Sequence, residues 1–291
     1  MKVVYRMAIS VVVFLALVAP AMAQSTAPAG PSRYLQIYRE EVKPGKNAAH
    51  EKIETAWARA SAKAKGYANY VAWVSLSGNN EAWFLSGFPS ADAWEKSINS
   101  IDANAAVKAE TDQLASQDTD VLTGARSLWV TYREDLSHRP GVDLPHIRYV
   151  TVTIVRIRPG HNSEFEDNRK MVKAAHEKTG LKDNHSVWQV LSGMPAGTFL
   201  IITPMKAMAE MDASTEMHGP GTAYADAVGD EGRKKMTANS SAATMSAETL
   251  IFAVNPKMSY PSKEYVAADP DFWAPKTKPA AKAAAPAKKT P

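Results

Sequence analysis

The sequence predicts an α+β protein in which two tandem βαββαβ units pack sheet to sheet as one intramolecular barrel. Two observations predict this fold. A long segment of the chain is repeated, and the first strand of each copy carries apolar or aromatic side chains on both faces. Strands of this kind are normally buried on both sides. Each sheet therefore needs a partner against the face that its own helices leave open.

The repeat aligns residues 33–95 with residues 148–210 without a gap, and 17 of the 63 aligned pairs are identical. Its spacing of 115 residues is too long for one unit of a solenoid and is the size of a small domain. The sequence therefore contains a duplicated domain, and each copy should contain the same order of elements.

The first two elements follow from composition and spacing. Residues 34–42 and 149–157 are rich in β-branched and aromatic side chains, which is typical of strands. A Pro-Gly turn follows in both copies, and Asn47 and Asn162 stand where a helix N-cap is expected. Apolar side chains then recur at helical spacing, with His50 on the side of the helix that faces the core.

The remaining elements complete the pattern in both copies. Two strand-like segments separated by Ser-Gly form a hairpin, a helical region follows, and a last apolar segment ends the unit. The resulting order, βαββαβ, is that of the ferredoxin-like unit. The predicted domains are a signal peptide at 1–23, a linker at 24–32, the first unit at 33–133, a linker at 134–146, the second unit at 147–254 and a disordered tail rich in Pro, Ala and Lys at 255–291.

The stretch "RYLQIYREEVKPGKNAAHE" at residues 33–51 resembles the opening of the dimeric α/β-barrel superfamily, especially its NIPSNAP-like and antibiotic-biosynthesis-monooxygenase-like branches. The shared pattern is an aromatic-rich strand, a Lys-Pro-Gly turn, a helix and a later strand that carries Trp73 or Trp188. The resemblance covers roughly residues 33–132 and 147–254. It implies the barrel fold, and it is compatible with cofactor-free monooxygenases, haem-binding and haem-degrading enzymes and binding proteins, so it does not select a reaction.

The first 23 residues have the pattern of a secretory signal peptide. Lys2 and Arg6 precede the apolar run 7–19, and Ala21-Met22-Ala23 is a small-residue cleavage site. We expect cleavage after Ala23, a periplasmic or secreted protein and no membrane span in the mature chain; an uncleaved anchor is the alternative.

Composition excludes several classes of site. The chain has no cysteine, so disulfides, thiolate nucleophiles and Cys-ligated zinc are impossible. Residues 255–291 carry seven lysines and three acids, so the basic character lies in the tail and the body from 24 to 254 has a net charge of −2. This distribution argues against nucleic-acid binding. The tail is free to contact anionic envelope surfaces.

Individual candidate residues are few, because no metalloprotease, nucleophile-elbow or phosphate-loop motif is present. His50 and His176 are the candidate catalytic histidines, as a general base or haem ligand; the alternative is a packed structural histidine. His185, at the start of a strand, is expected to be exposed. The candidate ligand-binding residues are Trp57, Trp73, Trp188 and His218, with a Trp-rich core and a solvated loop as the alternatives.

These observations lead to one functional prediction and two alternatives. We expect an exported barrel that binds a small apolar or aromatic molecule between its sheets, with no metal and no cofactor, haem being the alternative cofactor. The alternatives are a cofactor-independent monooxygenase or haem-active enzyme, and an interaction module of the cell envelope. The chain should be a monomeric pseudo-dimer, with further dimerisation left open.

Overall fold

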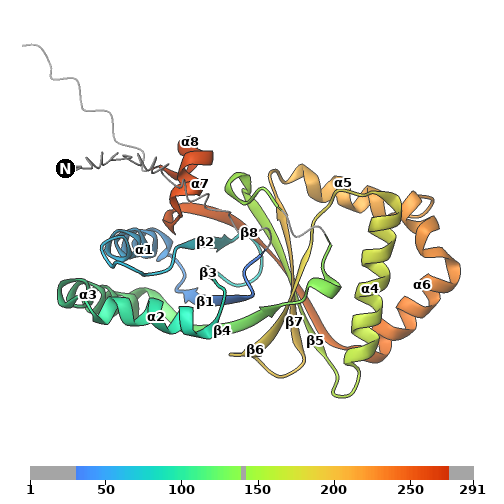
Figure 1. Ribbon diagram of the computed structural model, residues 1–291, viewed down its shortest axis with the longest axis horizontal. Coiled ribbons are helices and arrows are strands. Elements are labelled where there is room, and N and C mark those ends of the chain that lie inside the picture. The colour runs from blue at the N-terminus through green and yellow to red at the C-terminus, as the bar shows by residue number, and fades with distance from the viewer. Residues whose placement is uncertain (1–30, 139–141, 275–291) are drawn as a thin grey trace, which may run out of the picture.

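The computed structural model describes residues 31–138 and 142–274. Within them, eight strands form a closed barrel with the order β1-β3-β2-β8-β5-β7-β6-β4. The helices of the first unit lie on one side of this barrel and those of the second unit on the other (Figure 1). The predicted signal peptide at 1–23 lies outside the described residues. None of the described helices combines the length and apolar character that a membrane span requires.

The first unit has the predicted βαββαβ order, with its second helical region divided into two helices. Its sheet has the antiparallel strand order β4-β1-β3-β2. Its elements are β1 (Tyr34–Val42), α1 (Asn47–Ser61), β2 (Tyr70–Ser75), β3 (Glu81–Phe88), α2 (Ala91–Asp102), α3 (Ala105–Val121) and β4 (Leu122–Tyr132).

The second unit repeats this arrangement, with the strand order β8-β5-β7-β6. Two short 3-10 helices, η1 (Glu134–Leu136) and η2 (Leu144–His146), lie in the connection between the units. The elements of the second unit are β5 (Tyr149–Ile157), α4 (Asn162–Thr179), β6 (Ser186–Ser192), β7 (Thr198–Met205), α5 (Ala209–His218), α6 (Ala223–Ala243) and β8 (Thr244–Tyr260).

Two seams between the units close the barrel. Strand β2 pairs with β8, and β4 pairs with β6, all antiparallel. The retained Ser-Gly turns lie at these seams. A Cβ on Gly193 would lie 2.1 Å from the carbonyl oxygen of Ser127, and one on Gly78 would lie 2.4 Å from Cδ2 of Leu250. Both glycines have positive φ, 77° for Gly78 and 88° for Gly193. The repeat retains glycine here because the turn conformation and the neighbouring unit both exclude a side chain.

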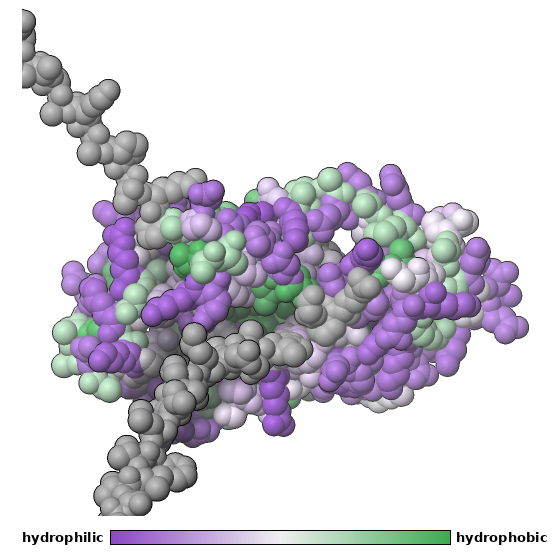
Figure 2. All heavy atoms as spheres, turned by 45° about the horizontal axis from the view of Figure 1, so that its top comes forward, coloured by the Kyte–Doolittle hydropathy of each residue, from purple (hydrophilic) through white to green (hydrophobic). Residues whose placement is uncertain are grey.

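The interior of the barrel is filled by side chains. Alternate residues of each strand point inward, and they form one apolar cluster that contains Trp73, Trp83, Trp188 and Phe252. Trp83 and Phe252 are fully buried and their rings lie 4.9 Å apart. On the face shown in Figure 2, strongly hydrophobic spheres are visible near the middle of the molecule and hydrophilic spheres cover much of the rest.

Two predictions about local structure are wrong. Asn47 and Asn162 are the first residues of their helices, and the N-cap positions are Lys46 and His161, neither of which forms a side-chain cap. The side chain of Asn47 instead exchanges hydrogen bonds with that of Asn80 in the turn between β2 and β3. The retained asparagine of the first copy therefore ties a turn to the helix.

The predicted tail also begins too early. Residues 255–260 continue β8, and α7 (Lys263–Ala268) and α8 (Pro270–Trp273) follow. Trp273 is buried and donates a hydrogen bond from Nε1 to the carbonyl oxygen of Pro145. Asn69 donates to the carbonyl oxygens of both Tyr260 and Pro261. The composition of 255–291 hid this segment because its aromatic residues are diluted by the Lys-Ala-Pro sequence that follows.

Candidate functional site

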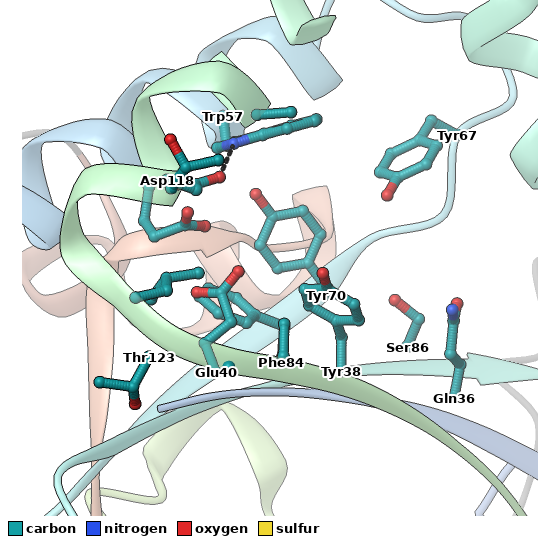
Figure 3. A pocket seen from close by; sticks show the side chains of 16 residues that line it. Gln36, Tyr38, Glu40, Trp57, Tyr67, Tyr70, Phe84, Ser86, Asp118 and Thr123 are labelled. Atoms are coloured by element: carbon teal, nitrogen blue, oxygen red, sulfur yellow. Dashed lines mark hydrogen bonds between the residues drawn. The ribbon is translucent and has the colours of Figure 1, made fainter. Parts of the chain in front are cut away.

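A pocket of about 590 Å³ lies in the first unit, between the outer face of its sheet and helices α1 and α3. Figure 3 shows carboxylates and aromatic rings from both layers converging on it. The lining side chains include Gln36, Tyr38, Glu40, Glu54, Trp57, Tyr67, Tyr70, Phe84, Ser86 and Asp118.

The registers of β1 and α1 bring several of these side chains together. Strand β1 contributes Gln36, Tyr38 and Glu40, because alternate residues of a strand share one face. Helix α1 contributes Glu54 and Trp57, which are three residues apart and therefore neighbours on one face. The same alternation sends the intervening residues of β1 into the barrel interior.

The walls of the pocket are largely aromatic. The rings of Tyr70 and Phe84 meet edge to face, with centroids 5.9 Å apart. The indole Nε1 of Trp57 donates a hydrogen bond of 3.2 Å to Oδ2 of Asp118 on α3, which fixes the ring at the pocket wall. In Figure 3 the hydroxyl groups of Tyr67 and Tyr70 point into the space between the helices and the sheet. A flat aromatic molecule has matching surfaces here.

A buried carboxylate–histidine pair forms the polar part of the site. Nε2 of His50 lies 2.6 Å from Oε2 of Glu40, and both side chains are buried. Glu54, four residues after His50 on α1, is also buried. The three side chains are close together: one nitrogen of His50 and one carboxylate oxygen of each glutamate all lie within 4.8 Å of one another. The short hydrogen bond occupies Nε2 of His50 and orients the carboxylate of Glu40. Glu40 itself lines the pocket.

The surroundings raise the pKa of the other two carboxyl groups of the pocket. Burial raises the pKa of Glu54 well above its ordinary value, and the charges of Glu40 and Asp118 add to this effect. Burial and the charge of Glu40 likewise raise the pKa of Asp118 to about 6, against the hydrogen bond from Trp57. Two acids pushed toward protonation next to an oriented carboxylate form a site with separate proton donors and acceptors.

The sequence matches no family model and no curated protein. Its fold, however, matches solved structures. An anthrone oxidase-like protein shares 13% identity and a TM-score of 0.52 over 77% of this chain and 92% of its own. A protein of Fusobacterium nucleatum subsp. nucleatum, provisionally named as a monooxygenase, shares 12% identity and a TM-score of 0.49 over 78% and 93%. A chlorite dismutase of Candidatus Nitrospira defluvii shares 8% identity and a TM-score of 0.43 over 78% and 92%.

The chain has the dimeric α/β-barrel fold. At these identities the likeness shows the fold alone. Both ferredoxin-like halves of the barrel belong to one chain, as the repeat predicted. The resemblance found in the sequence is thus confirmed at the level of the fold, and the reaction must be argued from the residues of the pocket.

Among the described residues, an apolar cluster occupies the barrel interior, where we expected a ligand between the sheets. A second pocket of about 260 Å³, with several charged residues in its lining, opens at one end. There Arg39 forms hydrogen bonds of 2.7–3.2 Å to the carboxylate of Glu81, and its guanidinium lies 4.3 Å from the ring centroid of Trp83. The aromatic pocket lies instead on the outer face of the first sheet.

The structure divides the predicted tryptophans between two places. Trp57 lines the aromatic pocket, whereas Trp73 and Trp188 belong to the apolar cluster of the barrel interior. The core alternative therefore describes both tryptophans that the repeat retains. Equivalent inward positions of the two units belong to the same apolar cluster, so both require a large apolar side chain.

The predicted histidines form two separate groups. His50 lies under α1 with Glu40. His176 and His218 come together in the second unit, where their Nε2 atoms are 2.9 Å apart. His185, expected to be exposed, is buried beside His176 with ring centroids 5.3 Å apart. Burial lowers the pKa of His185 to about 2, so this ring is neutral.

Sequence reasoning missed the carboxylates of the pocket. Glu54 follows His50 by four residues on the core-facing side of α1, and an acid at that position was an available signal. Glu40 stands in the outward register of β1, two residues before the strand ends at Val42, and its burial there is not evident from the sequence. Nothing in the sequence of α3 distinguishes Asp118 from the other acids of that helix.

Proposed function

We propose that the pocket beneath α1 and α3 binds a small aromatic molecule and that Glu40 accepts a proton from it. One observation carries this proposal: aromatic walls converge on a buried carboxylate that a histidine orients at 2.6 Å. A general base must be positioned first and have a suitable pKa second. Glu40 is positioned by His50, and Glu54 next to it is the candidate proton donor because its pKa is raised.

The charge of the pocket restricts the ligand. Glu40, Glu54 and Asp118 all line it, and no lysine or arginine does. An anionic ligand would find acidic side chains and no cationic partner in this partly desolvated space, and an unpaired charge is costly there. The ligand class is therefore a neutral or cationic aromatic compound that carries an acidic O–H or C–H group.

Haem, which the sequence resemblance allows as a cofactor, does not fit these residues. Nε2 of His50 is engaged by Glu40 at 2.6 Å, and the carboxylates of the pocket would repel the propionates of a porphyrin. Nε2 of His176 is 2.9 Å from Nε2 of His218, too close for a porphyrin plane to stand between them. We derive no step through haem.

Oxygenation without a cofactor is the second candidate function. It begins with removal of a proton from an electron-rich aromatic substrate, and the oriented Glu40 supplies a base for that step. Molecular oxygen would then be the oxidant. The observation that favours this candidate is the combination of the base with aromatic walls in one pocket.

Anthrone is a suitable probe because it is flat, neutral and aromatic and has acidic methylene hydrogens. We expect the protein to accelerate exchange of these hydrogens with deuterated solvent under anaerobic conditions, measured by proton NMR. Glu40→Gln should reduce the acceleration at least tenfold while calorimetry still detects anthrone binding.

Glu41→Gln is the matched control. Glu41 is the next residue of β1, faces away from the pocket and pairs with Arg126 at 3.4 Å. Equal exchange rates in wild type and Glu40→Gln would contradict the role of Glu40 as a base. Equally tight binding of anthrone and of its anionic counterpart anthracene-9-carboxylate would contradict the proposed ligand class.

We also propose that the chain is exported and cleaved after Ala23. The support is the charged start, apolar run and small-residue site of residues 1–23. N-terminal sequencing of the mature protein from a bacterial periplasmic fraction should give Gln24 as the first residue. Recovery of the uncleaved chain in the membrane fraction would favour the anchor alternative.

A further inference from the structure

The second unit brings three potential ligand atoms together away from the aromatic pocket. His176 lies in the last turns of α4, Asp183 in the loop before β6, and His218 at the end of α5. Nε2 of His176 is 2.9 Å from Oδ2 of Asp183 and 2.9 Å from Nε2 of His218. Oδ2 of Asp183 is 3.5 Å from Nε2 of His218. These three atoms form a compact triangle.

The hydrogen bonds on the far side of both rings fix which nitrogen carries the proton. Nδ1 of His176 lies 2.7 Å from the carbonyl oxygen of Val172, and Nδ1 of His218 lies 2.6 Å from that of Ser214. A carbonyl oxygen only accepts, so each Nδ1 carries a hydrogen. In the neutral rings both Nε2 lone pairs then point at each other and at a carboxylate oxygen. Such an arrangement requires a shared cation.

The size of the triangle matches the first coordination shell of a transition metal. Nitrogen and carboxylate oxygen ligands lie about 2.0–2.2 Å from zinc. At that distance, neighbouring ligands are about 3.3 Å apart in a tetrahedron and about 2.9 Å apart in an octahedron. The observed separations of 2.9, 2.9 and 3.5 Å span this range. Backbone carbonyls that accept from the distal nitrogen are also the usual outer partners of metal-bound histidine.

We infer that His176, Asp183 and His218 bind one divalent transition-metal ion through Nε2, Oδ2 and Nε2. Two imidazoles and one carboxylate favour a first-row transition metal such as zinc, cobalt or iron over magnesium or calcium, which prefer oxygen ligands. Three protein ligands also leave coordination positions for a further ligand, which is typical of reactive rather than purely structural sites.

The surroundings contain polar atoms that this ion, or a ligand bound to it, would satisfy. Oδ1 of Asp183, Nε2 of His185, and Nε and Nη2 of Arg169 are buried without a hydrogen-bond partner. Buried polar atoms in this state are costly. Arg169 adds a positive charge near His185, so the bound ion is expected to recruit an anion as its further ligand. The ring of Tyr224 closes the other side, 5.1 Å from His176 and 4.5 Å from His218.

The site exists only in the second copy of the repeat. Ser61 and Ala68 occupy the positions of His176 and Asp183 in the first copy, and His218 lies beyond the aligned residues. No single stretch has the spacing of a metal motif, because the three ligands come from two helices and a loop. The sequence therefore suggested His176 and His218 separately and predicted no metal site.

Zinc and cobalt are the probes for the test. The full chain, prepared without a histidine tag and dialysed against a chelator, is titrated with ZnCl₂ by calorimetry and with CoCl₂ by visible absorption. We expect one ion per chain with a dissociation constant below micromolar, cobalt ligand-field bands, and a rise of several degrees in Tm on adding zinc. His218→Gln and Asp183→Asn should each weaken zinc binding at least a hundredfold and abolish the bands.

His161→Gln is the matched control, because His161 lies at the other end of α4 and also pairs with an acid, Glu164, at 3.0 Å. It should bind zinc like wild type. Circular dichroism on each metal-free variant establishes folding independently of the metal. Absence of zinc binding to wild type, or unchanged binding in folded His218→Gln and Asp183→Asn, would overturn the inference. The anthrone experiment tests the other unit and is independent of this result.

Discussion

The space between sheet and helices has been used differently in the two units of the barrel. At equivalent positions of the repeat, Glu54 corresponds to Arg169, Trp57 to Val172 and Tyr70 to His185. The first space is a pocket with acids and aromatic rings, whereas the second is closed around histidines and a buried arginine. An acid at the centre of the first space is replaced by a base in the second.

The interior of the barrel shows the opposite behaviour. Trp73 and Trp188 occupy equivalent inward positions and belong to a single apolar cluster. Inward residues of the two sheets pack against each other, so a change in one copy affects both. Outward residues contact only the helices of their own unit. The duplicated scaffold therefore preserves its interior and leaves two independent outer spaces for different chemistry.

The largest effects should come from the shared interior. Trp73→Ala and Trp188→Ala should each lower the free energy of unfolding by about 3–5 kcal/mol, because each removes a large buried ring and leaves a cavity. Urea unfolding measures both. Similar losses would support equivalent roles in one cluster; a loss below about 1 kcal/mol for either variant would contradict it.

Substitutions at the two seams should destabilise the protein to different extents. Gly193→Ala would place Cβ 2.1 Å from a backbone oxygen of Ser127, whereas Gly78→Ala would meet only the flexible end of Leu250. Both substitutions also impose positive φ on alanine, which costs about 1–3 kcal/mol. We expect Gly193→Ala to destabilise the protein more than Gly78→Ala in the same urea assay. The reverse order would show that the seams differ in some other way.

Asp118 gives a smaller, pH-dependent effect confined to the first unit. Its pKa is raised from 3.8 to about 6, so the folded protein holds this proton more tightly than the unfolded chain. The resulting stabilisation is complete below the unfolded pKa and is lost as the pH rises from about 4 through 6. Asp118→Asn should therefore stabilise the protein at pH 7 by about 1 kcal/mol, after allowance for solvent screening at this half-buried group, and should have no such effect at pH 4.

The control for this titration is Asp120→Asn, an exposed acid at the end of the same helix. Thermal unfolding at pH 4 and pH 7 compares the two variants with wild type. A gain from Asp118→Asn that is equal at both pH values would show that the carboxyl group does not titrate in this range.

The smallest effects should come from ion pairs that link the helices of each unit. Lys63, just after α1, pairs with Glu110 on α3 at 2.7 Å, and Lys235 on α6 pairs with Asp167 on α4 at 3.4 Å. All four side chains are well exposed, so Lys63→Ala and Lys235→Ala should each cost less than about 1 kcal/mol. Chemical denaturation should show that the stability lost in either variant is smaller at high salt than at low salt.

The repeat and the alternation of apolar residues were sufficient to predict most of the fold. They predicted the element order and the closure of two sheets, because these depend on patterns within short segments. The end of β8 and helices α7 and α8 were missed because their stability comes from contacts such as that of Trp273 with Pro145, distant in the sequence.

The sites were less predictable for a related reason. His50, Trp57, His176 and His218 could be selected by residue type and position, but their partners could not. The pairing of His50 with Glu40 depends on how α1 crosses β1, and that of His176 with His218 on how α5 returns to α4. Such registers are set by packing of whole elements, which a single sequence does not display.

The position of β8 in the closed barrel has a consequence for biosynthesis. The first unit is complete at Tyr132, yet its edge strand β2 gains its second neighbour only when β8, residues 244–260, has been made. Until then the nascent chain presents an apolar sheet face and unpaired edges, the features that promote aggregation. A holding chaperone that keeps the chain extended until synthesis ends would protect this interval, and ribosome-bound chains stopped before Thr244 should remain sensitive to protease.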